Sequence, residues 1–413
     1  MKHDVIVIGG GASGMLAAGC AAENGARVLL LERNKRLGNK LRITGKGRCN
    51  LTNTCETAEF IEGYGRNGKF LYRALREFSN QDLVRFFNQQ GVDTKEERGG
   101  RIFPVSDKAV DVVNALERYM SKHNVTVKLN SRVGRIELNR ESNAVTGVAL
   151  KNRAKIIESG KIILATGGLS YPGTGSTGDG YAMAKQLGHS VVPLQPALVP
   201  FETVEKFPKD LQGLSLENVE VTVLCDSRKI TTEFGDMLFT HFGVSGPIIL
   251  RLSGRIVECL DNKKAVILSI NLKPALDEGK ITNRFLREFS GSGKKSLKTI
   301  IKGMLPRALV PVFIEASAIP GDKRCNQITG DERKALVRLM MDFRVTVKRA
   351  RSYAEAIITR GGIDLKEIDP RTMESTKVKG LYFCGEIIDI DGITGGYNLQ
   401  AAFSTGYLAA ISM

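Results

Sequence analysis

Three glycines near the N-terminus, Gly9, Gly11 and Gly14, have the G-x-G-x-x-G spacing that binds the pyrophosphate of a dinucleotide. In this pattern the first glycine allows a tight turn, the second lets the backbone approach the phosphates, and the third lets a helix pack closely on a sheet. Glu32 follows Gly9 by 23 residues, the position of an acid that accepts hydrogen bonds from ribose hydroxyls. These residues therefore predict the binding of an adenine dinucleotide, and at this point both FAD and NAD remain open.

Two strands and a helix must hold these residues in place. The apolar run Val5-Ile6-Val7-Ile8 ends at Gly9, which is typical of a buried parallel strand. The alanines between residues 17 and 22 predict a helix that ends near Gly25, and residues 26–31 predict a second strand that ends at Glu32. The N-terminus of the helix, at Ala12 and Ser13, would offer N–H groups and partial positive charge to a phosphate. This complete β-α-β context favours a dinucleotide over a glycine-rich turn that has no ligand.

Two later segments decide between FAD and NAD. Residues 161–167 form an apolar strand that runs into Ala-Thr-Gly, as in flavoproteins that return the chain beneath the cofactor. Near the C-terminus a strand leads into a Gly-Glu turn, and a Gly-Gly pair opens the last helix. That helix can direct its N-terminal dipole at the flavin region where negative charge develops on reduction. This arrangement is typical of FAD enzymes of the glutathione-reductase type, so we predict FAD. The contacts expected from these segments are Thr166, Gly167, Gly385, Glu386, Asp391, Gly396, Tyr397, Asn398 and Leu399.

The segment after Glu32 carries seven basic residues and no acid between Arg33 and Arg48. Its glycines and small polar residues leave backbone N–H groups free to fold over a pyrophosphate and a flavin edge. The phosphates of a dinucleotide would neutralise about two of these charges, and the others would remain available for an anionic substrate. The cofactor contacts expected from this basic loop are Arg33, Lys40, Thr44, Gly45, Gly47 and Asn50.

Two more positions belong to the cofactor prediction. Val133 begins a strand at the place where flavoproteins commonly let a backbone amide contact adenine. A second G-x-G-x-x-G match at residues 173–178 follows Tyr171-Pro172 rather than a strand, so it does not predict a second Rossmann turn. Asp179 then either caps the next helix or lies in a loop on the cofactor side.

The sequence pattern changes near residue 193, where alternating strands replace the nucleotide-binding pattern up to about residue 351. We predict an α/β fold with a split Rossmann-like FAD-binding domain, residues 1–193 and 352–413. The inserted domain, residues 194–351, is predicted to be β-rich with a basic helical part at about 275–316. It contains no glycine-rich strand-turn-helix, so we expect NAD(P)H to dock directly at the flavin.

Composition sets further limits. The 413 residues, 42% of them apolar, allow a globular protein with two or three domains. The chain has no apolar run of the length that a membrane span needs and no secretory leader, so we expect a cytoplasmic protein. Seven dispersed cysteines without a C-x-x-C pair and four scattered histidines predict free thiols and no metal site. The net charge of +16 fits either a solvated basic surface or an acidic partner.

Four segments resemble the BaiN/YhiN-like flavoproteins, and the resemblance extends over essentially the whole chain. They are residues 48–53, 165–172, 238–247 and 394–400. The resemblance implies non-covalent FAD and an inserted domain made of a β-barrel and helices. Activities attributed across this family include reduction of a uracil in ribosomal RNA, reduction of steroid-like enones and oxidation of aminoacetone, so the family leaves the substrate open.

Reduction of a conjugated C=C bond by a flavin hydride also requires a weak acid near the flavin ring. Cys49 lies in the basic loop and is the first candidate, although a small buried thiol that packs under the flavin fits the same residue. Tyr397 and His241 are further candidates, and a lone histidine is more often structural than catalytic.

Our leading hypothesis is a flavin-dependent reductase that forms dihydrouridine in ribosomal RNA, because an RNA substrate accounts for the excess positive charge. However, the chain contains no recognised RNA-binding module and no tryptophan for base stacking. One alternative is an oxidase or dehydrogenase of a small amine or enone. Another is an RNA-binding or assembly factor that is stabilised by flavin and needs no turnover.

Overall fold

The computed structural model describes residues 3–151, 155–291 and 293–413. The chain forms two compact units: residues 1–197 with 353–413, which we call the Rossmann unit, and residues 198–352, the inserted unit. The junctions expected from the sequence were 193/194 and 351/352. Within the described residues, no helix has both the length and the apolar character that a membrane crossing requires.

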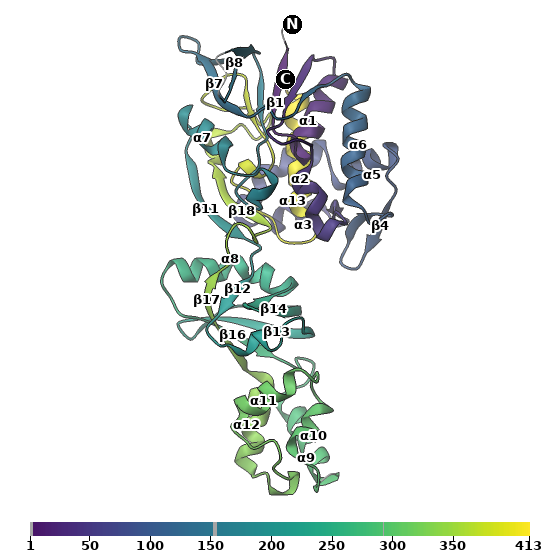
Figure 1. Cartoon of the computed structure of the whole chain (residues 1–413), viewed down its shortest axis with the longest axis vertical. Coiled ribbons are helices and arrows are strands. Elements are labelled where there is room, and N and C mark those ends of the chain that lie inside the picture. Colours follow the sequence, from purple (N-terminus) through teal and green to yellow (C-terminus); the bar gives the residue numbers. More distant parts are fainter. Residues whose placement is uncertain (1–2, 152–154, 292) are drawn as a thin grey trace. The chain divides into compact units, whose positions relative to one another are not determined.

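A five-stranded parallel sheet lies at the centre of the Rossmann unit (Figure 1). Its strand order is β19-β10-β1-β2-β6, and every neighbouring pair is parallel. The strands are β1 (Val5–Ile8), β2 (Val28–Leu31), β6 (Thr126–Lys128), β10 (Ile162–Leu164) and β19 (Leu381–Phe383). Every residue of β1, β2, β10 and β19 is buried, which explains why these strands are continuous apolar runs without polar alternation.

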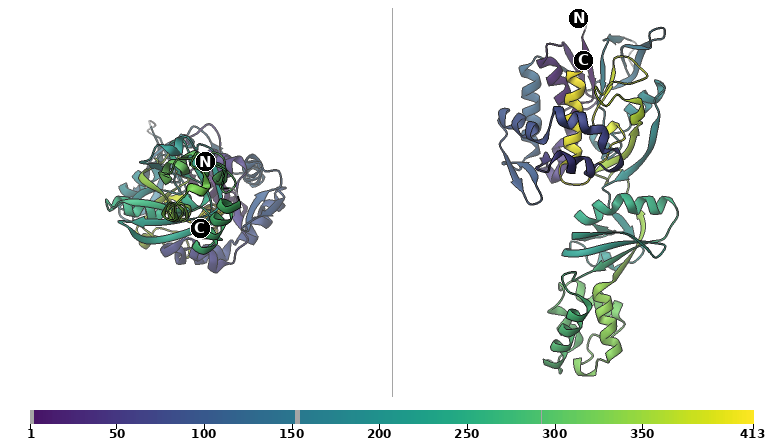
Figure 2. Two further views of the ribbon diagram at one scale, coloured as in Figure 1. Left: turned by 90° about the horizontal axis from the view of Figure 1, so that it is seen from below. Right: turned by 180° about the vertical axis from the view of Figure 1, so that it is seen from behind.

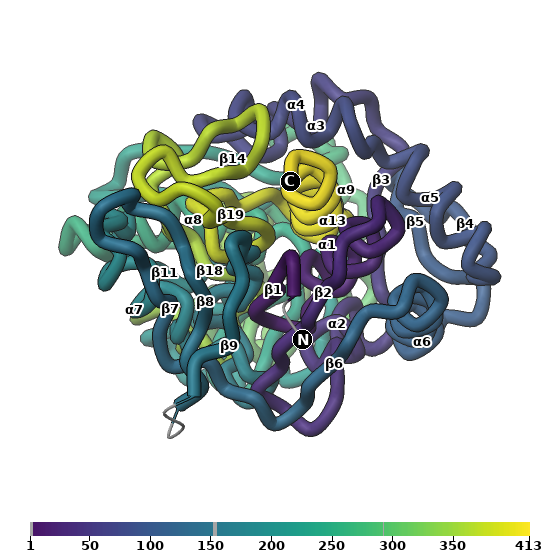
Figure 3. The backbone as a smooth tube through the Cα atoms, turned by 90° about the horizontal axis from the view of Figure 1, so that it is seen from above, coloured from purple at the N-terminus to yellow at the C-terminus, as the bar shows by residue number. Residues whose placement is uncertain are grey.

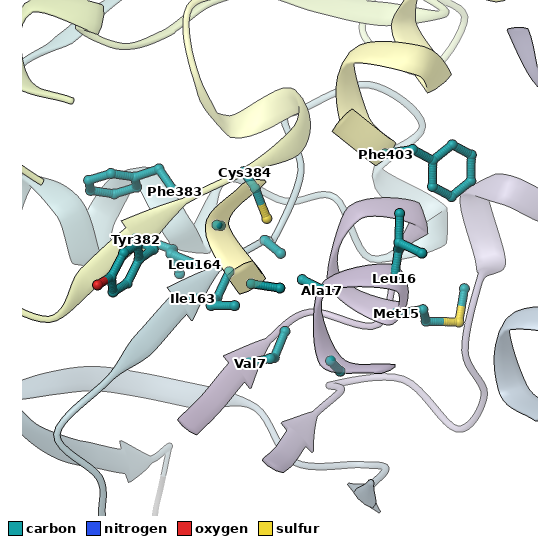
Figure 4. Close-up of a cluster of buried hydrophobic side chains, with 14 of the residues drawn as sticks. Val7, Met15, Leu16, Ala17, Ile163, Leu164, Tyr382, Phe383, Cys384 and Phe403 are labelled. Carbon is teal, nitrogen blue, oxygen red and sulfur yellow. The ribbon is translucent and has the colours of Figure 1, made fainter. Parts of the chain in front are cut away.

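Two helices from opposite ends of the chain pack against each other beside this sheet. They are α1 (Ala12–Glu23) and α13 (Tyr397–Ile411), which lie side by side in Figures 1 and 3. Helix α6 (Ala109–Lys122) also packs on α1. Figure 4 shows Leu16 of α1 and Phe403 of α13 in one buried cluster with Val7 and Leu164 of the sheet. Each such side chain contributes roughly 1.5–3 kcal/mol by leaving water, so the C-terminal return completes the core that the N-terminal strand begins.

Smaller elements surround the central sheet. The further helices of this unit are α2 (Asn39–Ile43), α3 (Thr57–Gly63), α4 (Tyr72–Glu77), α5 (Asn80–Gln89) and α7 (Asp179–Gln186). One small sheet has the order β3 (Thr52–Asn53), β5 (Arg101–Pro104) and β4 (Thr94–Glu97). A second has the order β7 (Val133–Asn139), β8 (Ala144–Leu150) and β9 (Ile156–Glu158), and β11 (Val191–Ala197) pairs with β18 (Ile358–Ile363).

The inserted unit contains a closed barrel with the strand order β12-β15-β14-β13-β16-β17. Its strands are β12 (Phe201–Thr203), β13 (Ser215–Cys225), β14 (Arg228–Thr240), β15 (Gly243–Ser245), β16 (Val266–Asn271) and β17 (Phe343–Ala350). Along β13 the buried side chains alternate, at Val219, Val221 and Val223, as expected for a strand with one face inside a barrel. Helix α8 (Pro247–Asp261) packs against β14.

A helical part lies in sequence between β16 and β17 (Figures 1 and 2). Its helices are α9 (Glu278–Gly291), α10 (Leu297–Lys302), α11 (Leu309–Ser317) and α12 (Gly330–Met341). The predicted range of 275–316 was too short, because α12 continues to Met341. The sequence carried a signal for α12: Thr329 and Glu332 form a capping box at its start.

A buried histidine, His189, is expected to make the Rossmann unit less stable in acid. His189 Nδ1 lies 3.0 Å from Glu367 Oε2, and its Nε2 lies 2.9 Å from Ser375 Oγ. Burial lowers the pKa of His189 below its ordinary 6.5, and the Glu367 carboxylate offsets this only in part. As the pH falls below 6.5 the unfolded chain therefore binds this proton first, and the free energy of unfolding decreases. We expect His189→Gln to flatten the pH dependence of urea unfolding between about pH 6.5 and 5. An unchanged slope in the variant would assign the acid sensitivity to other groups.

Candidate functional site

A cleft in the Rossmann unit opens at the carboxyl ends of its parallel strands. Its walls include residues 9–13 after β1, 32–34 after β2, 165–167 after β10, and Gly385 and Glu386 after β19. Ligands of open α/β sheets bind at this edge. All lining residues belong to the Rossmann unit, so the cleft is complete within one compact body.

The three glycines of the first turn differ in how much space surrounds the position of an added Cβ atom. Gly9 has φ +109°, and a Cβ there would lie 2.5 Å from the Ala165 carbonyl oxygen. A Cβ on Gly14 would lie 2.0 Å from the Gly9 carbonyl oxygen. A Cβ on Gly11 would have no described atom within 4 Å, and Gly11 lines the cleft. The packing of the protein thus accounts for the first and third glycines, whereas the second leaves space for a ligand.

Two polar features of the cleft fit a phosphorylated cofactor. The N-cap of α1 is Gly11, which makes no side-chain cap bond, so the N-terminal N–H groups of the helix are available to an anion. Thr166 lines the cleft, and its buried Oγ1 has no hydrogen-bond partner within the described part of the chain. Buried hydroxyls are normally paired. The residues present therefore fit the pyrophosphate region of FAD.

Glu32 is fixed by the backbone at the end of β2. Its Oε2 accepts a hydrogen bond of 2.7 Å from the Gly10 N–H, and its Oε1 accepts one of 2.8 Å from the Asn34 N–H. An ionised carboxylate has about four lone-pair sites, so both oxygens can accept further bonds. Glu32 also lines the cleft, and ribose recognition by this carboxylate stays a prediction.

A second carboxylate, Glu386, joins three distant segments on the cleft wall. Its Oε1 accepts hydrogen bonds from Ser170 Oγ at 2.7 Å and from the Thr359 N–H at 2.9 Å. Its Oε2 forms an ion pair with Lys40 Nζ, which also donates to Ser170 Oγ at 2.6 Å. The Lys40 charge, expected to be available for the cofactor, is therefore already neutralised inside the protein.

Most of the basic residues in the basic loop are, like Lys40, paired with acids inside the protein. Four of its seven basic residues form ion pairs within the Rossmann unit: Arg33 with Asp179, Lys40 with Glu386, Arg42 with Glu117, and Arg48 with Glu97 and Asp107. The carboxylates lie far away in the sequence, so the local absence of acids was misleading. The expectation that five charges of this loop remain free for an anionic substrate is wrong.

Comparison with known proteins identifies the family. The profile of the HI0933-like protein Rossmann domain matches residues 3–412. The chain belongs to this family. The "Ribosomal RNA dihydrouridine synthase" of Escherichia coli (strain K12) is 34% identical over 99% of this chain and 97% of its own length. The "3-dehydro-bile acid delta(4,6)-reductase" of Clostridium scindens is 31% identical, over 98% of this chain and 97% of that protein.

The fold also agrees with that of solved flavoenzymes. The structure of 3-ketosteroid delta1-dehydrogenase from Sterolibacterium denitrificans superposes with a TM-score of 0.56 at 14% identity, over 99% of both chains. At that identity the likeness concerns the fold alone. The predicted resemblance and the α/β fold with an inserted barrel are confirmed. The protein is an FAD-dependent oxidoreductase.

Most predicted cofactor residues line the cleft. They are Gly9, Gly11, Ala12, Ser13, Glu32, Arg33, Lys40, Thr44, Val133, Thr166, Gly167, Asp179, Gly385, Glu386, Asn398 and Leu399. Those outside its lining are Gly14, Gly45, Gly47, Asn50, Asp391, Gly396 and Tyr397. Some of these have structural partners instead. Asp391 pairs with Arg360 at 2.9 Å, and a Cβ on Gly396 would lie 2.3 Å from the Thr52 carbonyl oxygen.

One interpretation of the sequence was that Asp179 caps α7, and the structure shows that it does not. It is the first residue of the helix, the N-cap is Gly178, and no side-chain cap bond forms. Its carboxylate instead accepts hydrogen bonds from Arg132 at 2.6 and 2.7 Å and from Arg33 at 3.0 Å. Asp179 thus holds two guanidinium groups at the rim of the cleft.

Several cleft residues were missed by sequence reasoning. They include Asn34, Asn39, Ser131, Arg132, Thr174, Gly175, Ser176, Thr177, Ile358 and Ile390. Two parts of this set could have been found from the sequence. The segment 173–178 matches a glycine-rich motif, and Arg132 directly precedes Val133, which was predicted to contact the cofactor. Ile358 and Ile390 resemble ordinary core residues, and only the folded chain places them in the cleft.

The three candidate acids are in different surroundings. Cys49 is completely buried and outside the cleft lining, and burial raises the pKa of its thiol. Tyr397 packs on Phe60, and its hydroxyl lies 3.3 Å from Cys55 Sγ. His241 is exposed in the inserted unit, directly after β14. The structure therefore favours the packing role for Cys49, whereas the catalytic role of His241 stays a prediction.

We expect Cys49→Ala to retain bound flavin and full turnover, because Cys49 is completely buried and lies outside the cleft lining, where its thiol cannot reach a substrate. Steady-state turnover per bound flavin is the measurement. Native Cys49 should also resist alkylation until the protein unfolds, as peptide mass spectrometry would show. A large loss of turnover with intact flavin content would restore Cys49 as a catalytic candidate.

Proposed function

We propose that this protein reduces a uracil of ribosomal RNA to dihydrouridine, with NAD(P)H as electron donor. The observation that carries the proposal is similarity over nearly the whole chain to two relatives named "Ribosomal RNA dihydrouridine synthase", from Escherichia coli at 34% and Haemophilus influenzae at 33% identity. The net charge of +16 supports it, because a polyanionic substrate favours a basic protein.

FAD, when bound, supplies hydride transfer to one carbon of a conjugated double bond. The contribution of the chain is to hold that cofactor. The N-terminus of α1 would bind the pyrophosphate. Glu32 and Glu386, which also line the cleft, are held by hydrogen bonds from the Gly10 N–H and the Thr359 N–H. Direct docking of NAD(P)H is supported by the inserted unit, which forms a barrel and helices rather than a second parallel β-α-β sheet in the residues described.

The test compares ribosomal RNA from wild-type, deletion and complemented cells by nucleoside mass spectrometry. We expect the deletion strain to lose dihydrouridine at one or more ribosomal RNA positions, and the wild-type gene to restore it. A Gly11→Val gene, whose side chain would enter the cleft, should not restore it. An unchanged dihydrouridine content after deletion would refute the proposal, and rescue of a ribosome defect by a flavin-free variant would favour an assembly factor.

The relative named 3-dehydro-bile acid delta(4,6)-reductase supports a second candidate, reduction of a steroid-like enone. Both candidates saturate a double bond, so the same cleft serves either. Oxidation of NAD(P)H by the purified protein with a 3-keto-4-ene steroid distinguishes them. Turnover on the steroid without any change in ribosomal RNA would select this second function.

A further inference from the structure

The helical part of the inserted unit carries six exposed basic residues that share one property, the lack of an ion pair in the described ranges. They are Lys294, Lys295, Lys298, Lys302, Arg307 and Arg324, and we call them the basic face. Between Phe289 and Ile314 the chain contains five of them and no acidic residue. The helical part thus contains a local excess of positive charge, in contrast to the paired basic loop of the Rossmann unit.

The fold brings Arg324 to the lysines, although it lies about 30 residues later in the sequence. Ser296 forms an antiparallel bridge with Arg324. On either side of it the Leu297 N–H donates to the Lys323 carbonyl at 2.9 Å, and the Cys325 N–H donates to the Lys295 carbonyl at 3.0 Å. These backbone bonds hold the segment that carries Lys295 and Lys298 against the segment that carries Arg324, so the fold brings these charges near one another.

The basic face differs from the basic loop in its lack of ion pairs among the residues described. None of its six residues forms an ion pair with a carboxylate in the described ranges, whereas the neighbouring Lys323 pairs with Glu332 at 2.6 Å. Like charges that are held close together repel each other, and such a patch creates a positive potential that attracts a polyanion. The arrangement therefore points to a partner rather than to intramolecular stabilisation.

The surroundings of the basic face identify the kind of polyanion. Within the described residues of 278–341, the one large hydrophobic side chain that is exposed is Leu286. A membrane-binding helix would place several apolar side chains beside its lysines, and a protein interface would need an apolar centre. Single-stranded RNA would need aromatic side chains for base stacking. Duplex RNA, in contrast, is contacted largely through its phosphates and 2′-hydroxyls.

We propose that the basic face binds the phosphate backbone of a double-helical segment of the RNA substrate. The identity of that RNA rests on the proposed function, but binding to the phosphates does not depend on flavin chemistry. The basic face would hold the RNA by contacts that carry no sequence information, and each phosphate contact would add about 0.9 to the salt dependence of binding.

The test uses two triple variants of the full-length, flavin-loaded protein with the same change in net charge. The first removes charges of the basic face, in Lys294→Gln/Lys295→Gln/Lys298→Gln. The control, Lys185→Gln/Lys366→Gln/Lys379→Gln, changes exposed lysines of the Rossmann unit. Binding to a 20-base-pair RNA duplex and to deproteinised ribosomal RNA is measured between about 50 and 200 mM salt.

We expect the first variant to bind RNA at least tenfold more weakly at about 100 mM salt, with the salt slope reduced by about 2 to 3. The control should change both quantities much less. NAD(P)H oxidation with a small electron acceptor should stay at the wild-type rate in both variants, which shows that the flavin site is intact. Equal losses in the two variants, or wild-type binding by the first, would overturn the proposal. Binding to anionic vesicles in preference to RNA would overturn it too.

Failure of this proposal can be distinguished from failure of the proposed function. If deletion of the gene removes dihydrouridine but the first variant binds RNA normally, the protein modifies RNA and uses another surface. If the basic face binds duplex RNA but deletion leaves dihydrouridine unchanged, the surface is correct and the reaction is not.

Discussion

Gly14→Ala is expected to destabilise the Rossmann unit by about 3 kcal/mol or more and to leave it without flavin. The added Cβ would lie 2.0 Å from the Gly9 carbonyl oxygen, and a backbone atom cannot move aside as a flexible side chain can. Helix α1 would have to move away from the sheet, yet α13 and α6 already pack against it. Urea unfolding and the visible flavin absorbance of the purified protein measure the two effects.

Gly11→Ala is the matched control, since it adds the same methyl group three residues earlier. No described atom lies within 4 Å of that Cβ, and the backbone of Gly11 is in an extended conformation that alanine adopts readily. We expect a stability change of about 1 kcal/mol or less, together with weaker flavin binding. Normal folding and flavin content in Gly14→Ala would show that helix α1 does not pack as closely on the Gly9 carbonyl oxygen as the structure indicates. Normal flavin affinity in Gly11→Ala would show that this position does not face the pyrophosphate.

Glu386→Ala is expected to lower the free energy of unfolding by about 3 kcal/mol and to reduce flavin occupancy. The variant removes the acceptor of Ser170 Oγ and of the Thr359 N–H, and it leaves the Lys40 ammonium without its carboxylate. The side chains of Lys40 and Glu386 are only 26% and 19% exposed, so water compensates these losses incompletely. Denaturant unfolding of the apoprotein separates the stability effect from that of flavin binding.

A double-mutant cycle isolates the ion pair from the neutral hydrogen bonds. Glu386→Gln keeps an oxygen that can accept from Ser170 and Thr359 but leaves Lys40 unpaired, so we expect a smaller loss than in Glu386→Ala. Adding Lys40→Met should recover part of that loss, with a coupling of about 1–2 kcal/mol. Strictly additive effects of the two substitutions would contradict an ion pair that contributes to stability.

Local features of the fold were accessible from the sequence because their causes are local. A run such as Val5-Ile6-Val7-Ile8 followed by glycine specifies a buried strand and a turn, and both are present as β1 and the start of α1. The last helix was predicted from its glycine pair, and α13 begins at Tyr397, directly after Gly396. Part of the cleft lining was accessible for the same reason, since that part consists of turns that follow recognisable strands.

The electrostatics of the site were decided by the tertiary structure. Lys40 and Glu386 are 346 residues apart, and Arg33 and Asp179 are 146 residues apart. An ion pair depends on distance in space, and sequence spacing reports only neighbours along a helix or strand. For the same reason the sequence left two roles open for Cys49, a catalytic thiol and a buried packing residue, because a glycine-rich loop can lie either on the surface or beneath other segments.

The sequence by itself determined the dinucleotide fingerprint, the FAD-type order of segments, the family and the total charge of +16. Only the tertiary structure decided which of those charges remain unpaired. It pairs four of the seven basic residues of the basic loop with distant acids and leaves the basic face of the inserted unit exposed. The physical reason is that composition sets the net charge, whereas chain topology sets which opposite charges come within a few ångströms of each other.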